Sequence, residues 1–292
     1  MSLMNRLPAR LVRGLCFAAA LLGVMAWSTS ASAQEPRVYN FSPVNQYGLE
    51  LTASYWNPII DYVSRKSGVK LQLKLGRTSA DTTAYVLANE VGFVFSNHLF
   101  SPDRDNLGWK IFGRRDTTPI RSQIVVLADS PIQKLEQLAN ETVAFPGPEA
   151  TVAYKFSYAN LLNQKIPVQV VFAGNMDGAF AQLASGRVKA VGTHTQLSAG
   201  WSLRENKSLR ALWESEPLND LALMAAKNVS AKDLAAVSKA FLEMNKDPVG
   251  KKVLAAASDL VKLPLATAFV PSSSADYAAY RNFYQTAPPS LR

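Results

Sequence analysis

Residues 69–98, VKLQLKLGRTSADTTAYVLANEVGFVFSNH, and residues 168–194, VQVVFAGNMDGAFAQLASGRVKAVGTH, share one succession of features. Each begins with an apolar run typical of a β-strand, passes a glycine and a polar loop, and continues with the spacing of a helix. Each ends in a second apolar run followed by a histidine. The two stretches predict two βαβ units and, with them, two similar lobes facing each other across a cleft. Two unrelated units of this common type would give the same pattern.

The rest of the chain continues this alternation. Further apolar runs of strand length lie at 38–41, 124–127 and 143–145. Helical spacing predicts a helix over about 51–63, which Gly68 would end, another over about 150–163, and a later one that Ser230 would cap. Strands and helices that alternate in this way predict the α/β class, with a mainly parallel sheet and helical crossovers.

The two quoted stretches end in the only histidines of the protein, His98 and His194. Ligands of open α/β sheets bind at the carboxyl ends of the strands, so both histidines are candidate ligand contacts. Asn97 and Thr193, directly before them, are candidates for the same reason. A buried structural role is the alternative for each histidine. A metal site is not expected, because no cluster of further ligands accompanies either one.

The first 33 residues have the three parts of a secretory signal peptide. A start with three arginines is followed by the apolar run LCFAAALLGVMAW (15–27) and by small residues up to Ala33, near which we expect cleavage. The run is too short to span a bilayer, which needs about 20 residues. An N-terminal core helix is the alternative. The one cysteine, Cys16, lies inside the signal and upstream of most of the apolar run, so neither a lipid anchor nor a disulfide is expected.

Composition and motifs argue against several classes of function. The formal net charge is +9, but Lys and Arg are scattered along the chain, which gives no support to nucleic-acid binding. Neither G-x-S-x-G nor H-E-x-x-H occurs, so no catalytic residue, metal or cofactor is predicted. No later apolar run approaches the length of a membrane span, and stable membrane insertion is not expected.

Six segments, by their order and spacing, resemble the periplasmic substrate-binding proteins of phosphate, phosphite and phosphonate ABC transporters. They are YWNPIIDYVSRKSGVKL (55–71), FSNHLF (95–100), IRSQIVVLADSPIQKLEQL (120–138), VAFPGPEATVAY (143–154), FAGNMDGAFAQLASG (172–186) and MNKDPVGKKVL (244–254). The resemblance implies the type II periplasmic-binding-protein fold, with two Rossmann-like lobes joined by two crossing segments and a ligand cleft between them. One lobe would comprise residues 37–120 plus 217–292, and the other residues 121–216.

The resemblance also implies ligand contacts. Phosphonate binders grip the phosphoryl oxygens with a Ser-Thr-Ser run before a helix, and the matching stretch EATVA (149–153) keeps only the hydroxyl of Thr151. Asn175 stands where some members have a phosphonate-binding histidine; N-capping of a helix is its alternative role. Gln196 stands where aminophosphonate binders have a glutamate. These departures leave the ligand open between a phosphonate, phosphite or phosphate and a carboxylate or amine.

Three further residues are candidates because of their positions. Arg121, at the expected crossing between lobes, could clamp a carboxylate or phosphoryl group through paired hydrogen bonds; a structural ion pair is its alternative. Ser122 beside it would be a second donor. Tyr47, on the loop after the first strand, could cover the ligand or be an exposed loop residue.

These observations predict the solute-binding component of an ABC importer. A monomer in the periplasm would close two lobes on a small polar, anionic ligand and deliver it to a membrane permease. Ligand sensing for a membrane receptor is the alternative, because it would use the same closing lobes.

Overall fold

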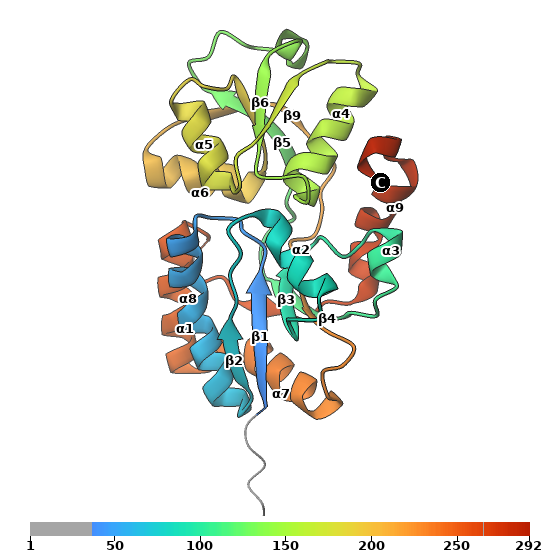
Figure 1. Ribbon diagram of the computed structural model, residues 1–292. Helices are drawn as coiled ribbons and strands as arrows, with labels where there is room; N and C mark the ends of the chain where they lie inside the picture. Colours follow the sequence, from blue (N-terminus) through green and yellow to red (C-terminus); the bar gives the residue numbers. More distant parts are fainter. Residues whose placement is uncertain (1–36, 265) are drawn as a thin grey trace, which may run out of the picture. The chain divides into compact units, whose positions relative to one another are not determined.

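A computed structural model of the protein describes residues 37–264 and 266–292. These residues form two β-sheets, each with its own helices (Figure 1). The predicted signal peptide, residues 1–33, lies outside the described residues. Within them, no helix has the length and apolar character needed to cross a membrane.

The first sheet has six strands in the order β11-β4-β10-β3-β1-β2. Its strands are β1 (Val38–Pro43), β2 (Lys70–Leu73), β3 (Phe93–Ser96), β4 (Lys110–Arg115), β10 (Ala222–Ala225) and β11 (Phe269–Val270). Its helices are α1 (Leu49–Ser67), α2 (Ser79–Leu87), α3 (Pro102–Asp105), α7 (Ala231–Leu242), α8 (Pro248–Val261) and α9 (Ala278–Thr286). We call this sheet and these helices the first lobe.

The second sheet has five strands in the order β7-β6-β8-β5-β9. Its strands are β5 (Ser122–Leu127), β6 (Thr142–Phe145), β7 (Gln169–Phe172), β8 (Ala190–His194) and β9 (Leu209–Glu214). Its helices are α4 (Ser157–Asn163), α5 (Met176–Ala184) and α6 (Thr195–Glu205). We call this sheet and these helices the second lobe.

Both predicted βαβ units are confirmed. They are β2–α2–β3 in the first lobe and β7–α5–β8 in the second. In each, the two strands flank a third strand, β1 or β6, and run parallel to it. The shared order β2-β1-β3 and β7-β6-β8 places His98 and His194 after corresponding strands of the two sheets.

The prediction of a mainly parallel sheet is wrong. Beyond β3 and β8, the next strands are β10 and β5, and both are antiparallel to their neighbours. Each of these strands follows directly on a segment that brings the chain from the other sheet, so it enters from the opposite direction. The two crossing segments pair with each other through Ile120 and Leu218, whose backbone N–H and C=O groups are joined at 2.8 and 2.7 Å.

Local sequence signals explain where helices begin and end. Gly68 ends α1 in the left-handed conformation, with φ of 70°, as predicted. The hydroxyl of Ser230 accepts from the backbone N–H of Asp233 at 3.1 Å and caps α7, also as predicted. The expected helix over 150–163 is divided: Thr151–Phe156 form a π-helical turn, and α4 continues from it.

Candidate ligand-binding site

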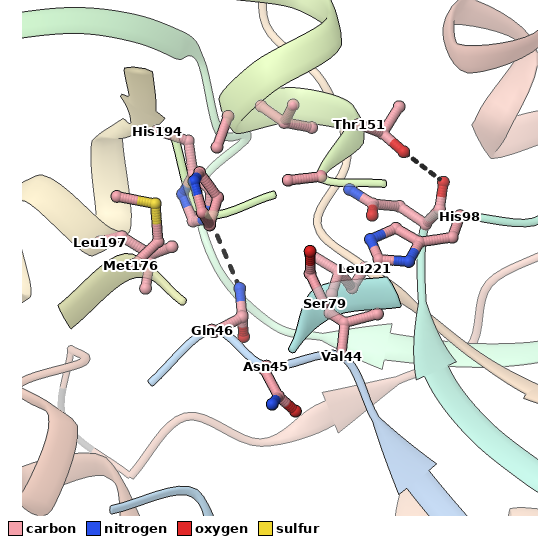
Figure 2. A pocket seen from close by; sticks show the side chains of 15 residues that line it. Val44, Asn45, Gln46, Ser79, His98, Thr151, Met176, His194, Leu197 and Leu221 are labelled. Carbon is pink, nitrogen blue, oxygen red and sulfur yellow. Dashed lines mark hydrogen bonds between the residues drawn. The ribbon is translucent and has the colours of Figure 1, made fainter. Parts of the chain in front are cut away.

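A buried cavity lies where the two lobes meet (Figure 2). The cavity has a volume of about 40 Å³, which is enough for about three waters or one small molecule. Its polar lining residues are Asn45, Gln46, Ser79, Asn97, His98, Thr151 and His194. Its apolar lining residues are Val44, Pro146, Ala150, Val152, Ala153, Met176, Leu197 and Leu221. Among the described residues, no charged side chain lines it.

Four helical segments begin at this cavity. Ser79, Thr151 and Met176 line it and are the first residues of α2, the π-helical turn and α5, while His194 is the N-cap of α6. The first N–H groups of a helix have no partner within the helix and carry partial positive charge. Helix starts that meet at one cavity therefore make it attractive to an anion, even without a charged side chain.

Several buried polar atoms at and behind the cavity have no hydrogen-bond partner among the described residues. Asn45 Oδ1, Ser79 Oγ and His194 Nδ1 belong to lining residues. Arg115 Nη1 and Gln196 Nε2 belong to residues directly behind them. A buried polar group without a partner costs roughly 1–3 kcal/mol, so such groups in one place indicate a binding site.

The residues directly behind the cavity are organised by Arg115, which the sequence analysis missed. Its Nε and Nη2 donate to the two carboxylate oxygens of Asp220 at 2.6 and 3.1 Å. Nη2 also donates to Gln46 Oε1 at 3.2 Å and to Gln196 Oε1 at 3.4 Å, which joins the two lobes. The guanidinium lies 4.9 Å from the ring centre of Phe95. Arg115 is 1% exposed, and its charge is balanced by Asp220.

A signal for Arg115 existed in the sequence. It ends β4, which runs in the same direction as β3 because both are antiparallel to β10. The strand-end rule that selected His98 would therefore have selected Arg115 as well.

The two histidines lie on opposite sides of the cavity (Figure 2). His98 Nδ1 is 3.1 Å from the hydroxyl of Thr83, and His194 Nε2 is 3.4 Å from Nε2 of Gln46. Burial lowers the pKa of His98 to about 3 and the pKa of His194 to about 4. Both rings are therefore neutral near pH 7.

Two other predicted contacts also lie at the cavity. Thr151 lines it, and its hydroxyl donates to the backbone carbonyl of Asn97 at 3.0 Å, which links the second lobe to the first (Figure 2). Asn97 lines the cavity as well. Glu149, two residues before Thr151, points to the first lobe, where it pairs with Arg104. This ion pair lowers the pKa of the Glu149 carboxyl against the opposing effect of burial, and the carboxylate is ionised.

The second-lobe candidates outside the cavity lining have other partners. Arg121 Nη1 donates to the backbone carbonyl of Ser215 at 2.7 Å. The Ser122 hydroxyl is buried and donates to the backbone carbonyl of Val152 at 2.8 Å. Asn175 caps α5 by accepting from the backbone N–H of Gly178 at 2.9 Å, the alternative role foreseen for it.

Three further candidates lie near the cavity but not in its lining. Thr193 is fully buried in β8 next to His194. Gln196 accepts from Arg115 behind the cavity. Tyr47 is buried, and the guanidinium of Arg204 lies 5.5 Å from its ring centre. Four predicted contacts thus line the cavity, namely Asn97, His98, Thr151 and His194, whereas the lining residues Asn45 and Ser79 were not predicted.

Comparison with known proteins gives a family and a fold. The model of the family described as ABC transporter, phosphonate, periplasmic substrate-binding protein matches residues 41–277. No curated protein sequence matches the chain significantly.

Solved structures with the same fold share little sequence with the chain. The binding protein component of an ABC phosphonate transporter from Pseudomonas aeruginosa is 16% identical, with a TM-score of 0.72 over 86% of this chain and 87% of that one. PhnD1 from Prochlorococcus marinus in complex with methylphosphonate is also 16% identical, with a TM-score of 0.70 over 86% of this chain and 97% of that one. An ancestral arginine-binding protein bound to arginine is 19% identical, with a TM-score of 0.53 over 75% and 97%. These likenesses show the type II periplasmic-binding-protein fold.

Proposed function

The chain belongs to the family of periplasmic substrate-binding proteins of phosphonate ABC transporters, and from this premise we propose that it captures a small phosphorus oxyanion and delivers it to the permease of an ABC importer. The ligand occupies the cavity between the lobes. The protein works as a monomer in the periplasm after its signal is removed near Ala33, and it binds without a cofactor.

The observation that carries this proposal is the set of unpaired, uncharged groups around the cavity. Ser79 Oγ and His194 Nδ1 are buried there without partners among the described residues, and four helical segments begin there. An oxyanion of a few atoms offers several acceptor oxygens at short range, which suits this arrangement. The small volume favours phosphite or methylphosphonate over larger ligands.

Ligand capture also explains why groups of both lobes line one cavity. Asn45, Ser79 and His98 come from the first lobe, whereas Thr151 and His194 come from the second. The lobes contact each other beside the cavity through the backbone N–H of Gly48 and the carboxylate of Asp177, 2.8 Å apart. A ligand that bonds to both lobes stabilises the conformation in which the lobes are in contact over one in which they are separated. A permease can distinguish these two conformations.

A thermal-shift screen tests the proposal. Purified protein is heated with phosphite, methylphosphonate, phosphate, acetate or arginine at millimolar concentration, and responses are followed by calorimetric titration. Mass action predicts a rise in melting temperature with at least one phosphorus oxyanion.

A serine pair supplies the matched variants for the screen. Ser79→Ala, which removes a lining hydroxyl, should weaken binding about 3- to 10-fold. Ser185→Ala, at an exposed position outside the cavity lining, should leave it unchanged. A protein that responds to none of the phosphorus oxyanions, or only to arginine or acetate, would refute the proposed ligand class.

A further inference from the structure

The direction of its hydrogen bonds determines which nitrogen of His194 can donate. Arg115 only donates, so the Gln46 amide turns its oxygen to Arg115. The amide nitrogen then faces His194 Nε2 (Figure 2). An amide nitrogen only donates, and His194 Nε2 therefore accepts. The ring proton is then on Nδ1, which is buried without a partner among the described residues. His194 offers a donor.

His98, in contrast, offers an acceptor to the cavity. The single hydroxyl hydrogen of Thr83 can go to Glu149 Oε2, 3.4 Å away, or to His98 Nδ1, 3.1 Å away. A carboxylate is a stronger acceptor than a neutral imidazole, and the negative charge of Glu149 favours a proton on the near side of the ring. Thr83 thus donates to Glu149 and accepts from His98 Nδ1–H. The lone pair of Nε2 remains for the cavity that His98 lines.

We infer that the cavity selects an oxyanion that carries a hydroxyl group, namely a phosphite or phosphonate in its monoprotonated form. The ligand O–H donates to His98 Nε2, and its unprotonated oxygens accept from His194 Nδ1–H and from the helix starts. His98 is then the specificity-determining residue that rejects the phosphite or phosphonate dianion, whose oxygens only accept. This inference rests on the proposed function and adds the protonation state of the ligand to it.

The charged groups that face the histidines do not change the protonation assigned to the two rings. Glu149, Arg104 and Lys155 face His98, and Asp220 and Arg115 face His194. Burial keeps both histidines neutral above pH 6. Burial also lowers the pKa of Lys155, and a Lys155→Gln variant separates its titration from that of the ligand.

The first test needs no ligand. Nitrogen-15 NMR of imidazole groups distinguishes the two neutral tautomers, and both histidines should carry the proton on Nδ1. In Glu149→Met, the carboxylate acceptor of Thr83 is removed, and the hydroxyl hydrogen of Thr83 then goes to His98 Nδ1. The His98 proton should move to Nε2 in this variant, and it should stay on Nδ1 in Glu136→Met, a change at an exposed glutamate. A wild-type His98 protonated on Nε2 would overturn the inference.

The second test is titration calorimetry with phosphite and methylphosphonate from pH 6 to 8.5. The apparent Kd should rise tenfold per pH unit above the second ionisation of each ligand, in the wild type and in Lys155→Gln. Glu149→Met should reduce this slope, and sulfate, which has no hydroxyl at these pH values, should not compete. Binding that is tight and independent of pH would overturn the inference and leave the proposed function standing. The absence of binding by any oxyanion would instead refute the proposed function.

Discussion

Replacing Arg115 with methionine should destabilise the protein more than removing the charge of any other arginine in residues 37–264 and 266–292. Arg115 is 1% exposed and Asp220 is 1% exposed, and both carboxylate oxygens of Asp220 are bonded by the guanidinium. Methionine keeps most of the buried volume and removes every one of these bonds. Asp220 is then left as a buried charge without a partner.

The expected cost follows from this geometry. Breaking a buried ion pair by removal of one partner costs about 3–5 kcal/mol. For a chain of this size, each kcal/mol lowers the melting temperature by roughly 2–4 °C, so the decrease should be roughly 6–20 °C. An exposed pair would lose at most about 1 kcal/mol, and the two cases are readily distinguished.

Chemical denaturation monitored by tryptophan fluorescence measures the change. The double variant Arg115→Met/Asp220→Leu removes both charges and should recover more than half of the loss, because an apolar pair of similar volume is tolerated in place of a buried ion pair. The control Arg187→Met, at an exposed position, should change stability by less than about 0.5 kcal/mol. A loss below about 1 kcal/mol in Arg115→Met, or no recovery in the double variant, would refute the reasoning.

Three further changes follow from the structure. Glu149→Gln should cost roughly 1 kcal/mol at neutral pH by removing the negative charge that pairs with Arg104. Because the ion pair lowers the pKa of Glu149 from 4.5, the difference from wild type should vanish in urea titrations as the pH falls through and below that value. Between about pH 6.5 and 4, His98 and His194 bind protons in the unfolded chain but not in the folded one. The free energy of unfolding should therefore fall by about 1.4 kcal/mol per histidine for each unit by which the pH is lowered. Replacing both histidines with asparagine should abolish this dependence. Gly192→Ala would place a Cβ in the space of an aromatic ring and a backbone carbonyl, and should cost at least about 1–3 kcal/mol in the same assay, with unchanged stability contradicting the packing.

Local patterns were sufficient for the parts of the fold that depend on neighbours in sequence. The βαβ units, the left-handed end of α1 at Gly68 and the cap at Ser230 were all predicted, because each is determined within one or two turns of chain. The positions of His98 and His194 followed from the same units and the strand-end rule. The family resemblance is likewise confirmed by the match over residues 41–277.

Features that depend on distant pairing could not be predicted in this way. The antiparallel strands β5 and β10 have ordinary apolar sequences, and their direction is decided by which sheet the chain has just left. Asp220 is 105 positions from Arg115 in sequence, and no local pattern joins them. Arg121, by contrast, stood at the expected crossing and therefore drew attention, yet it donates to a backbone carbonyl outside the cavity lining.

The buried ion pair acts on the cavity through hydrogen-bond direction more than through charge. Asp220 balances the charge of Arg115, and the uncharged amide of Gln46 separates the guanidinium from His194. Arg115 therefore fixes the orientation of the Gln46 amide, and this amide in turn allows His194 to donate only from Nδ1. On the other side of the cavity, Glu149 and Thr83 also hold the proton of His98 on Nδ1, but there Nε2 remains for the ligand, as an acceptor. An uncharged cavity with one fixed donor and one fixed acceptor discriminates by the position of hydrogen atoms on the ligand, and it does so without the strong charge attraction that would slow release to a permease.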